Sequence, residues 1–415
     1  NMKKQTLLTA TFPSVLPRRT LALAVAAFCT ASATTPAFAQ EMTESEAPAV
    51  TSIGDALAQG EATLSFRART EMVDVDGSDV DLTSLKTRLT YSSAAYQGFS
   101  TTIEMDDVTH ITDFEGGVGD PEGTEVNQAY LAYATGATTF KYGRQRILLD
   151  NQRFVGGVGF RQNEQTYDGF SASNTSLADT TLFLAHIHNV NRIFGEDSPV
   201  GDHANDSYLV NAKYSGLSAG TLSGYAYLID NEDAAAFSTD TYGIRFAGSQ
   251  ADLSYALEYA MQSAAANNPA NYDADYVLAE GSYKLGAVTL TAGYELLGAD
   301  GADGQFITPL ATLHKFQGWT DKFLGGGTGN LAGGIEDTYL SVATSLGGVK
   351  LALNYHQLSS DDSGVSGMDT LGSEAGFLVA GKLAGVNLSM KYSSYSAEDF
   401  SVDTDKLWLT AAASF

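Results

Sequence analysis

From residue 60 to the end of the chain, apolar and polar residues alternate with a period of two. The segment 386–393 is typical and has the sequence Val-Asn-Leu-Ser-Met-Lys-Tyr-Ser. Successive side chains of a β-strand point to opposite faces, so this alternation predicts strands with one apolar and one polar face. A strand that separates lipid from water requires such a pair of faces.

The alternation recurs often enough to predict eighteen strands, an even number. We expect them near residues 60–72, 82–94, 97–108, 124–134, 137–147, 163–173, 178–190, 204–215, 219–231, 238–249, 250–262, 272–284, 286–297, 335–346, 347–358, 373–383, 385–396 and 404–415. Residues 40–59, which precede them, are polar, and a short helix is predicted around 53–59.

The connections between these strands alternate in length. Tight turns such as 96–98, 346–348 and 383–385 take turns with longer segments rich in Asp, Gly and Asn. A soluble β-sandwich has no reason to sort its connections in this way, whereas an outer-membrane barrel has short periplasmic turns and long extracellular loops. The predicted fold is therefore an all-β, transmembrane, antiparallel up-and-down barrel of about eighteen strands.

The two ends of the chain support this interpretation. Basic residues at 3, 4, 18 and 19 precede an apolar run at 21–28 and the small-residue site Ala37-Phe38-Ala39, which predicts a signal peptide cleaved before Gln40. The last strand alternates up to Phe415 and resembles the carboxy-terminal insertion signal of outer-membrane barrels. We expect a signal peptide at 1–39, a short periplasmic segment at 40–59 and a barrel at 60–415, located in the bacterial outer membrane.

Composition narrows the chemistry of the mature chain. The only cysteine, Cys29, lies in the predicted leader, so neither a disulfide nor a thiolate metal site is expected. The leader holds four basic residues and no acidic one, which leaves 19 Lys and Arg against 49 Asp and Glu. This acidic excess argues against nucleic acid as a partner.

Many acidic residues fall in predicted outer loops, as at 74–81, 115–125, 230–233 and 361–362. Oxygen-rich loops can bind Mg²⁺ or Ca²⁺ and bridge lipopolysaccharide, and a solvated acidic rim is the simpler alternative. None of the loops has the spaced ligands of a calcium-binding loop, so no metal residue and no cofactor are predicted. The expected partners of the outer surface of the barrel are outer-membrane lipid and lipopolysaccharide.

Strand alternation places basic residues on the face that would line the lumen. They are Arg67, Arg69, Lys86, Arg88, Lys141, Lys213, Arg245, Lys284, Lys350, Lys382, Lys391 and Lys406. About six acidic residues share this face: Glu71, Glu104, Asp106, Glu258, Glu280 and Glu295. The basic excess predicts a lumen that favours anions, because low-dielectric walls focus the field of the charges that line them.

Within this set, Arg67, Arg69, Lys86 and Arg88 would form a ladder on the first two strands. One interpretation gives the ladder a role in anion conductance. The alternative is that its charges balance acidic residues across neighbouring strands.

Two segments resemble the alginate export family of outer-membrane porins. One runs from Gly143-Arg144-Gln145 to Tyr167-Asp168, and the other is Thr308 to Phe323. The resemblance also takes in 55–57 and 66–69, and it implies that Arg144, Arg153 and Arg161 belong to an electropositive, loop-constricted pathway. Alternation by itself would point Arg144 and Arg146 towards lipid, so either a bulge intervenes or these residues lie at the rim.

The second segment lies in the longest loop, 298–334. Its apolar and aromatic residues predict that the loop folds onto other parts of the protein. A plug or constriction in the lumen is one interpretation, and a packed extracellular cap is the other. The residues expected to form the constriction are Thr308, Pro309, His314, Lys315, Trp319 and Asp321.

Three functions follow from these observations. The first is a porin for passive diffusion of small hydrophilic, anionic solutes or acidic sugars; the second is an exporter of alginate or another acidic polysaccharide. The third is a structural or adhesion barrel without transport. An enzyme is not predicted: His186 and His188 share a face expected to point into the lumen, but no nucleophile or third ligand accompanies them. The solute, the direction of flux and the number of copies, with a homotrimer as one alternative, stay open.

Overall fold

The computed structural model describes residues 49–112 and 119–415. The predicted signal peptide at 1–39, part of the predicted periplasmic segment and part of the acidic loop at 115–125 therefore lie outside the described residues. Residues Val50–Phe415 form one compact unit. None of the helices within the described ranges has the length and apolar character needed to span a membrane.

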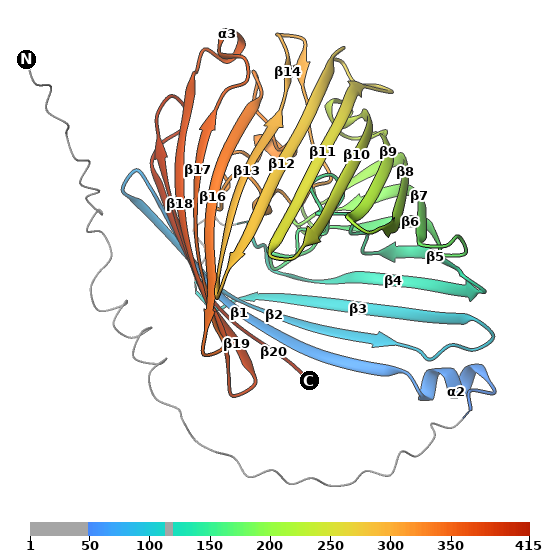
Figure 1. Cartoon of the computed structure of the whole chain (residues 1–415). Coiled ribbons are helices and arrows are strands. Elements are labelled where there is room, and N and C mark those ends of the chain that lie inside the picture. The colour runs from blue at the N-terminus through green and yellow to red at the C-terminus, as the bar shows by residue number, and fades with distance from the viewer. Residues whose placement is uncertain (1–48, 113–118) are drawn as a thin grey trace, which may run out of the picture. The chain divides into compact units, whose positions relative to one another are not determined.

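The unit is an antiparallel sheet of eighteen strands (Figure 1). They are β1 Glu61–Val75, β2 Ser78–Ser92, β3 Phe99–His110, β4 Gly123–Thr135, β5 Thr138–Gln145, β6 Thr166–Asn174, β7 Thr180–Asn191, β8 Asp202–Leu217, β9 Gly220–Ile229, β10 Thr239–Gln250, β11 Leu253–Ala264, β12 Asp273–Leu285, β13 Val288–Leu297, β16 Ile335–Leu346, β17 Val349–Ser359, β18 Thr370–Leu383, β19 Val386–Ala397 and β20 Thr404–Ser414.

The remaining elements are short. A separate two-stranded hairpin, β14 Ala299–Asp300 with β15 Gly304–Gln305, lies in the loop between β13 and β16. The α-helices are α2 Ile53–Ala58, capped by the side chain of Ser52, and α3 Ser363–Ser366. Three 3₁₀ turns lie at Ala235–Phe237, Leu313–Lys315 and Gly325–Gly327.

The sheet closes on itself because β1 pairs with both β2 and β20. In the closing pair Phe66 lies opposite Ala413, and the backbones of Leu64 and Phe415 exchange hydrogen bonds of 2.8 and 3.1 Å. Closure leaves no unpaired strand edge in the wall, which a membrane demands because lipid cannot satisfy free backbone groups. The predicted all-β barrel of eighteen strands is confirmed.

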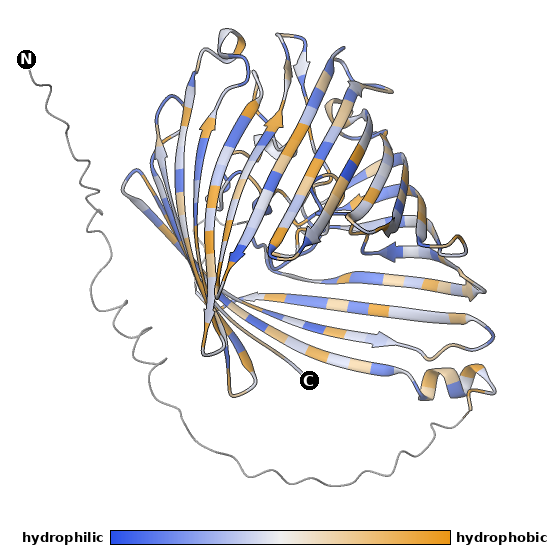
Figure 2. Cartoon of the chain, in the orientation of Figure 1, coloured by the Kyte–Doolittle hydropathy of each residue, from blue (hydrophilic) through white to orange (hydrophobic). Residues whose placement is uncertain are grey.

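The two faces of the wall differ as the alternation predicts. Large apolar side chains such as Leu257 (54% exposed) and Leu340 (58% exposed) point outward, while polar and charged side chains on the intervening positions are buried inside. Figure 2 shows the alternation as bands of opposite hydropathy along the strands. Outward apolar exposure together with a polar interior is the arrangement of a barrel in lipid.

Tyrosines on the outer face hydrogen-bond to carboxylates of neighbouring strands. The hydroxyl of Tyr259 donates to Asp275 at 2.8 Å, and that of Tyr392 donates to Asp405 at 3.0 Å. Tyrosine has an apolar ring and a polar tip, so such pairs suit the boundary between lipid and water.

Two local predictions were wrong. The expected acidic loop at 74–81 is a tight hairpin, because β1 continues to Val75 and β2 begins at Ser78 around a two-residue Asp76-Gly77 turn with positive φ at both positions. Asp-Gly is a favoured sequence for this turn. The second concerns β5 and β6, which are shorter than expected: β5 ends at Gln145 and β6 begins at Thr166, so residues 146–165 leave the wall.

Candidate functional site

Two loops, 146–165 and 298–334, fold against the inward faces of the strands and against each other. Val155 forms a parallel β-bridge with Leu310, and the Gly156 amide donates to the Leu310 carbonyl at 2.9 Å. The Thr312 amide donates to the Gln152 carbonyl at 3.0 Å. The two loops therefore form one unit inside the barrel, which we call the double-loop constriction.

Two side chains at the start of β6, those of Gln165 and Tyr167, hydrogen-bond to both loops at their junction. Gln165 Nε2 donates to the carbonyls of Gly156 (3.1 Å) and Leu310 (3.0 Å), and the buried Tyr167 hydroxyl donates to Gly156 at 2.7 Å. A Cβ on Gly156 would come within 2.2 Å of Thr312 Oγ1, so only glycine fits there. The junction thus has its polar groups paired and no room for a side chain.

One end of the constriction is anchored by an apolar cluster against β9 to β13. The ring of Phe154 lies 5.3 Å from Tyr225, 5.1 Å from Tyr276 and 5.8 Å from Phe306, centroid to centroid. Tyr225 and Tyr276 belong to the wall, and Phe306 belongs to the long loop. This part of the lumen is therefore packed like a protein core.

The other end of loop 146–165 reaches the middle of β1. Arg67 donates from Nε to Gln162 Oε1 at 2.8 Å and from Nη1 to the Gly159 carbonyl at 2.9 Å, and Arg69 donates to the Phe160 carbonyl. Neither arginine forms an ion pair with any residue in the described part of the chain. Backbone carbonyls therefore hold both guanidinium groups, and their positive charges are not cancelled by a carboxylate.

Asp321 of the long loop connects the constriction to the wall. Its carboxylate lies 2.8 Å from Arg161 Nη2, 3.3 Å from Lys406 Nζ and 2.7 Å from His314 Nδ1. Burial acts to raise the pKa of Asp321, but a hydrogen bond from His314 and the charges of Lys406 and Arg161 hold this pKa well below its usual range. Burial also lowers the pKa of His314 to about 3, so the imidazole is neutral at physiological pH.

A lysine and several aromatic rings lie beside this network. Lys391 Nζ lies 3.0 Å from His314 Nε2 and is 4.4 Å from the ring centre of Phe160 and 4.6 Å from that of Trp319. The ring centre of Trp408 lies 5.6 Å from Lys391 Nζ. Lys391 has cation–π contacts but no carboxylate within ion-pair distance among the described residues.

The rest of the predicted ladder is neutralised. Arg88 lies 2.6 Å from Asp106 and 2.9 Å from Glu164, while Lys86 lies 3.6 Å from the same Glu164. Arg146 also contacts Glu164, at 2.5 Å. Burial acts to raise the pKa of Glu164, but Lys86, Arg88 and Arg146 lower it to about 2. Lys86 and Arg88 therefore have acidic partners, as the balancing alternative expects.

The predicted basic excess inside the barrel was too large. Its count omitted two buried strand carboxylates: Asp337, which lies 2.9 Å from His356 Nδ1, and Glu374, which accepts hydrogen bonds from Thr320 and Ser393. It also omitted acids that the loops carry inward, such as Glu164 and Asp321. Strand alternation cannot find loop residues, because their direction depends on tertiary contacts.

Other predicted pathway residues also have partners. Arg153 is fully buried with its Nε 2.8 Å from Glu295 Oε1, Arg245 lies 2.5 Å from Glu258, and Lys213 lies 3.2 Å from Asp150. Lys141 lies over the ring of Tyr130 at 4.6 Å. The long-loop residues Thr308, Pro309 and Lys315 belong to the constriction, where Thr308 Oγ1 accepts from Arg153 and Lys315 donates to the Asn151 carbonyl.

The two alternatives for Arg144 and Arg146 resolve differently. Tyr142, two residues before Arg144, is 65% exposed and points outward. Arg144 lies on the same face at the outer rim, and its guanidinium lies 3.0 Å from Asp168 and 3.0 Å from Glu196. Arg146 lies beyond the end of β5, so the alternation no longer applies, and it turns inward to Glu104 at 2.8 Å.

The expected direction of His186 and His188 was wrong. Ala185 and Ile187 are the buried residues of β7, so the histidines face outward with the exposed Leu184. His186 Nε2 lies 2.8 Å from Asp206 Oδ1 and its ring stacks on Tyr208. Within the described ranges, no group of three or more His, Cys, Asp or Glu residues is arranged to hold a metal ion.

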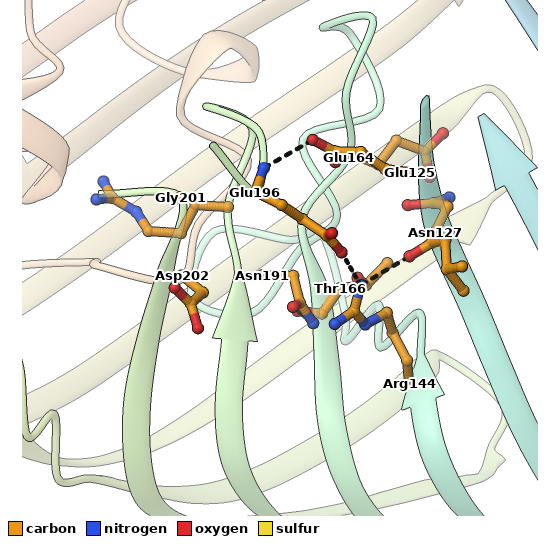
Figure 3. Close-up of a pocket in the computed structure, with 11 residues that line it drawn as sticks. Glu125, Asn127, Arg144, Glu164, Thr166, Asn191, Glu196, Gly201 and Asp202 are labelled. Atoms are coloured by element: carbon orange, nitrogen blue, oxygen red, sulfur yellow. Dashed lines mark hydrogen bonds and ion pairs between the residues drawn. The ribbon is translucent and has the colours of Figure 1, made fainter. Parts of the chain in front are cut away.

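A polar pocket of about 190 Å³ lies where β4 to β8 end at the rim (Figure 3). Its lining includes Arg144, Glu125 and Glu196, with the Glu196 amide donating to Glu125 at 2.8 Å, and Glu164 and Thr166 on the side of the constriction. Sequence reasoning missed this pocket because it depends on where the strands end.

The comparisons agree on the fold. The barrel is similar to solved outer-membrane porins of the Occ/Opd group, and each match covers 87% of this chain. Pseudomonas aeruginosa OccD3 matches with a TM-score of 0.67 and 14% identity over 92% of its own chain, and P. aeruginosa OccK9 with a TM-score of 0.70 and 15% identity over 99% of its chain. Acinetobacter baumannii OccAB2 matches with a TM-score of 0.69 and 14% identity over 99% of its chain. A search of curated proteins finds no match.

At this level of identity the solved structures show the fold alone. A family model described as alginate export matches residues 51–304, which include both the strand-one segment and the first constriction loop. Because this match spans more than half of the sequence, the chain belongs to the alginate export family.

Proposed function

We propose that the barrel is an outer-membrane pore for passive diffusion of small hydrophilic anions, acidic sugars among them. The observation that carries this proposal is the trio Arg67, Arg69 and Lys391 at the double-loop constriction. These are inward-facing cations that lack a carboxylate partner within the described residues, whereas Arg88, Arg153 and Arg245 are paired with carboxylates.

The energetic argument rests on desolvation. Moving a charge out of water costs several kcal/mol, and the carbonyls of Gly159 and Phe160 offset part of this cost without cancelling the charge. An anion that enters beside the trio therefore gains attraction in a region of low dielectric. A cation of the same size is repelled.

The surroundings of the trio favour a particular kind of solute. The half-buried rings of Phe160 and Trp319 lie beside Lys391, whereas the nearby ring of Trp408 is buried. Ring faces pack against flat or apolar surfaces, as the faces of sugars and aromatic rings are, while the lysine supplies the charge. A carboxylate on a ring-shaped body fits both. Passive diffusion of such a solute requires no cofactor, nucleophile or energy source.

The test is reversal potential in a planar bilayer under a tenfold KCl gradient. Wild type is expected to favour chloride, and the triple variant Arg67→Gln/Arg69→Gln/Lys391→Gln is expected to lose that preference. Lys322→Gln is the matched control, because Lys322 contacts Ser401 between β19 and β20, away from the trio. Cation selectivity in wild type would contradict the anion preference, and absence of conductance from a folded barrel would contradict the pore.

The family assignment supports a second candidate, export of an acidic polysaccharide. Passage of a polymer would require the loops to move, and their buried contacts, such as Arg153 with Glu295, oppose this movement. Exclusion of polyethylene glycols of increasing size separates the two candidates. A small cut-off supports the diffusion pore, and admission of long polymers supports the exporter. A structural barrel would conduct nothing.

A further inference from the structure

A loop at the rim folds over the end of β4 and forms one side of the polar pocket of about 190 Å³. Residues 192–201, between β7 and β8, make up this loop. Its two ends meet where the Arg192 amide donates to the Gly201 carbonyl at 2.7 Å. The Glu196 amide donates to Glu125 Oε1 on β4 at 2.8 Å. These bonds hold the loop against the wall and place Glu196 beside Glu125.

Most of the charged groups that line the pocket already have partners. Arg144 lies 3.0 Å from Glu196 (Figure 3) and 3.0 Å from Asp168, so one guanidinium group serves two carboxylates. Glu164 is paired with basic residues of the constriction. Glu125 differs, because no basic group lies within ion-pair distance of it among the described residues. Negative charge therefore exceeds positive charge on this side of the pocket.

Arg192, the other cation of the lining, is directed towards its own loop. Its Nη1 donates to the Val200 carbonyl at 3.3 Å and lies 3.2 Å from His203 Nε2. The guanidinium carbon lies 4.8 Å from the ring centre of Phe194. Within the described residues no ion pair joins Arg192 to Glu125, so the charge of that carboxylate is available to a ligand.

Two buried residues of the pocket have side-chain oxygen atoms without a partner. Asn127 is 6% exposed, Thr166 is 1% exposed, and both line the pocket. Asn127 Nδ2 donates to Glu104 at 2.7 Å. The Asn127 amide oxygen and the Thr166 hydroxyl, however, have no hydrogen bond to any residue in the described part of the chain. Buried polar atoms are nearly always hydrogen-bonded, so these two oxygens mark positions for a hydrogen-bonding ligand.

The free groups of the pocket are mainly hydrogen-bond acceptors, and this determines the kind of ligand that fits. A primary ammonium group supplies three donors together with a positive charge, and hydrogen bonds from a charged donor to a carboxylate are the stronger ones. A metal ion fits less well, because its oxygen ligands must converge to about 2.0–2.6 Å. No three acidic or histidine side chains in residues 49–112 and 119–415 are arranged in that way.

We propose that this pocket, hereafter the rim pocket, binds small primary amines that carry a hydroxyl group. The ammonium group donates to the carboxylates of Glu125 and Glu196 and to the amide oxygen of Asn127, and the hydroxyl of the ligand pairs with Thr166. The long loops mark this end of the barrel as extracellular, so the amine arrives from outside without passing the double-loop constriction. The rim pocket is therefore a site separate from the anion pathway of the proposed function.

The experiment measures ligand binding to the purified barrel in detergent by saturation-transfer difference NMR at pH 7 and low salt. Ethanolamine is the probe. Choline, which has the same charge and hydroxyl group but no N–H donor, and ethylene glycol, which has no charge, are the ligand controls. Because binding and not current is recorded, the outcome does not depend on the proposed pore.

Ethanolamine is expected to bind saturably, choline roughly tenfold more weakly, and ethylene glycol not at all. Glu125→Gln should weaken ethanolamine binding about tenfold, because glutamine still accepts from the Glu196 amide but lacks the charge. Glu398→Gln, an exposed position in the loop between β19 and β20, is the matched control and should bind as wild type does. Equal binding of choline and ethanolamine, or an unchanged affinity in Glu125→Gln, would overturn the proposal.

Thr166→Val tests the second contact without a change of charge, and valine keeps the shape of the buried side chain. Affinity for ethanolamine should fall about fivefold, as expected for one neutral hydrogen bond, while affinity for ethylamine should not change. Equal losses for the two amines would contradict the hydroxyl contact. O-Phosphoethanolamine, which resembles a lipid headgroup, should bind more weakly than ethanolamine because its phosphate would lie among carboxylates. Binding as tight as that of ethanolamine would contradict the assignment to free amines.

Discussion

Arg153 and Glu295 form a fully buried ion pair, with Arg153 Nε 2.8 Å from Glu295 Oε1 and Nη2 3.2 Å from Oε2. Arg153 belongs to loop 146–165, and Glu295 lies on β13 just before the long loop begins. Thr308 of the long loop accepts from the same guanidinium at 3.3 Å, and Phe316 lies beneath it at 4.7 Å. One guanidinium thus joins the wall to both loops of the constriction.

Arg153→Leu should detach the constriction from the wall, because it leaves the Glu295 carboxylate buried without its counter-charge. Removing one partner of such a pair costs about 3–5 kcal/mol. The expected outcome is noisier, larger single-channel conductance and a lower Tm of the barrel in detergent. The double variant Arg153→Leu/Glu295→Leu should recover most of the stability. A double variant no more stable than Arg153→Leu would argue that the charge pairing is not the cause.

Glu374→Gln should loosen the long loop at its opposite end. The carboxylate accepts hydrogen bonds from the amides of Trp319 and Thr320 and from the Ser393 hydroxyl at 2.5 Å. Glutamine keeps the shape but has one acceptor oxygen and adds donors, so at least one amide loses its partner. The polymer exclusion limit should rise, while Glu336→Gln, a carboxylate of the outer face bonded to Tyr294, should leave it unchanged.

Glu164→Gln should increase anion selectivity at pH 7, because it removes the carboxylate that neutralises Lys86, Arg88 and Arg146. In wild type the same charge is lost only by protonation, and the pKa of Glu164 is held at about 2 against an ordinary value of 4.5. Its stabilising contribution is therefore complete above pH 4.5 and is lost as the pH falls towards 2. Reversal potentials measured from pH 7 to pH 2 check the selectivity, and the Tm of the barrel over the same range checks the stability. A selectivity change in wild type centred near pH 6 would count against them.

Gly156→Ala should separate the two loops, because the new Cβ would lie 2.2 Å from Thr312 Oγ1 and 3.0 Å from the Thr312 amide nitrogen. Gly159→Ala is the matched control in the same loop, since no atom lies within 4 Å of its added Cβ. Faster protease cleavage of loop 298–334 and higher conductance are expected for Gly156→Ala alone. Identical behaviour of the two variants would show that the junction tolerates displacement.

Several parts of the lumen were predictable from the sequence. The inward direction of Arg67, Arg69 and Lys391 follows from strand alternation, which is a local property of the backbone. The involvement of 143–168 and 308–323 in a constriction was expected from a family resemblance. The contacts of the long loop with Glu374 and Lys406 on inward strand faces favour the constriction over the cap.

The charge of the lumen was not predictable in the same way. Counting strand residues indicated a basic excess throughout, but Glu164 and Asp321 arrive from loops and neutralise the central cations. A loop has no fixed periodicity, so the direction of its side chains depends on which partners pack against it. The outward direction of His186 was a failure of another kind, because it came from assigning the wrong face of β7 to the lumen.

The alternation alone was enough to predict a barrel of eighteen strands with a lipid face and a lumen face, since a period of two forces side chains to alternate wherever the chain is extended. Which cations lack a carboxylate partner depended on the folded arrangement of the loops. Ion pairs join residues as far apart as Arg153 and Glu295 or Arg161 and Asp321, and such partners meet only after the sheet closes and the two loops fold inside it.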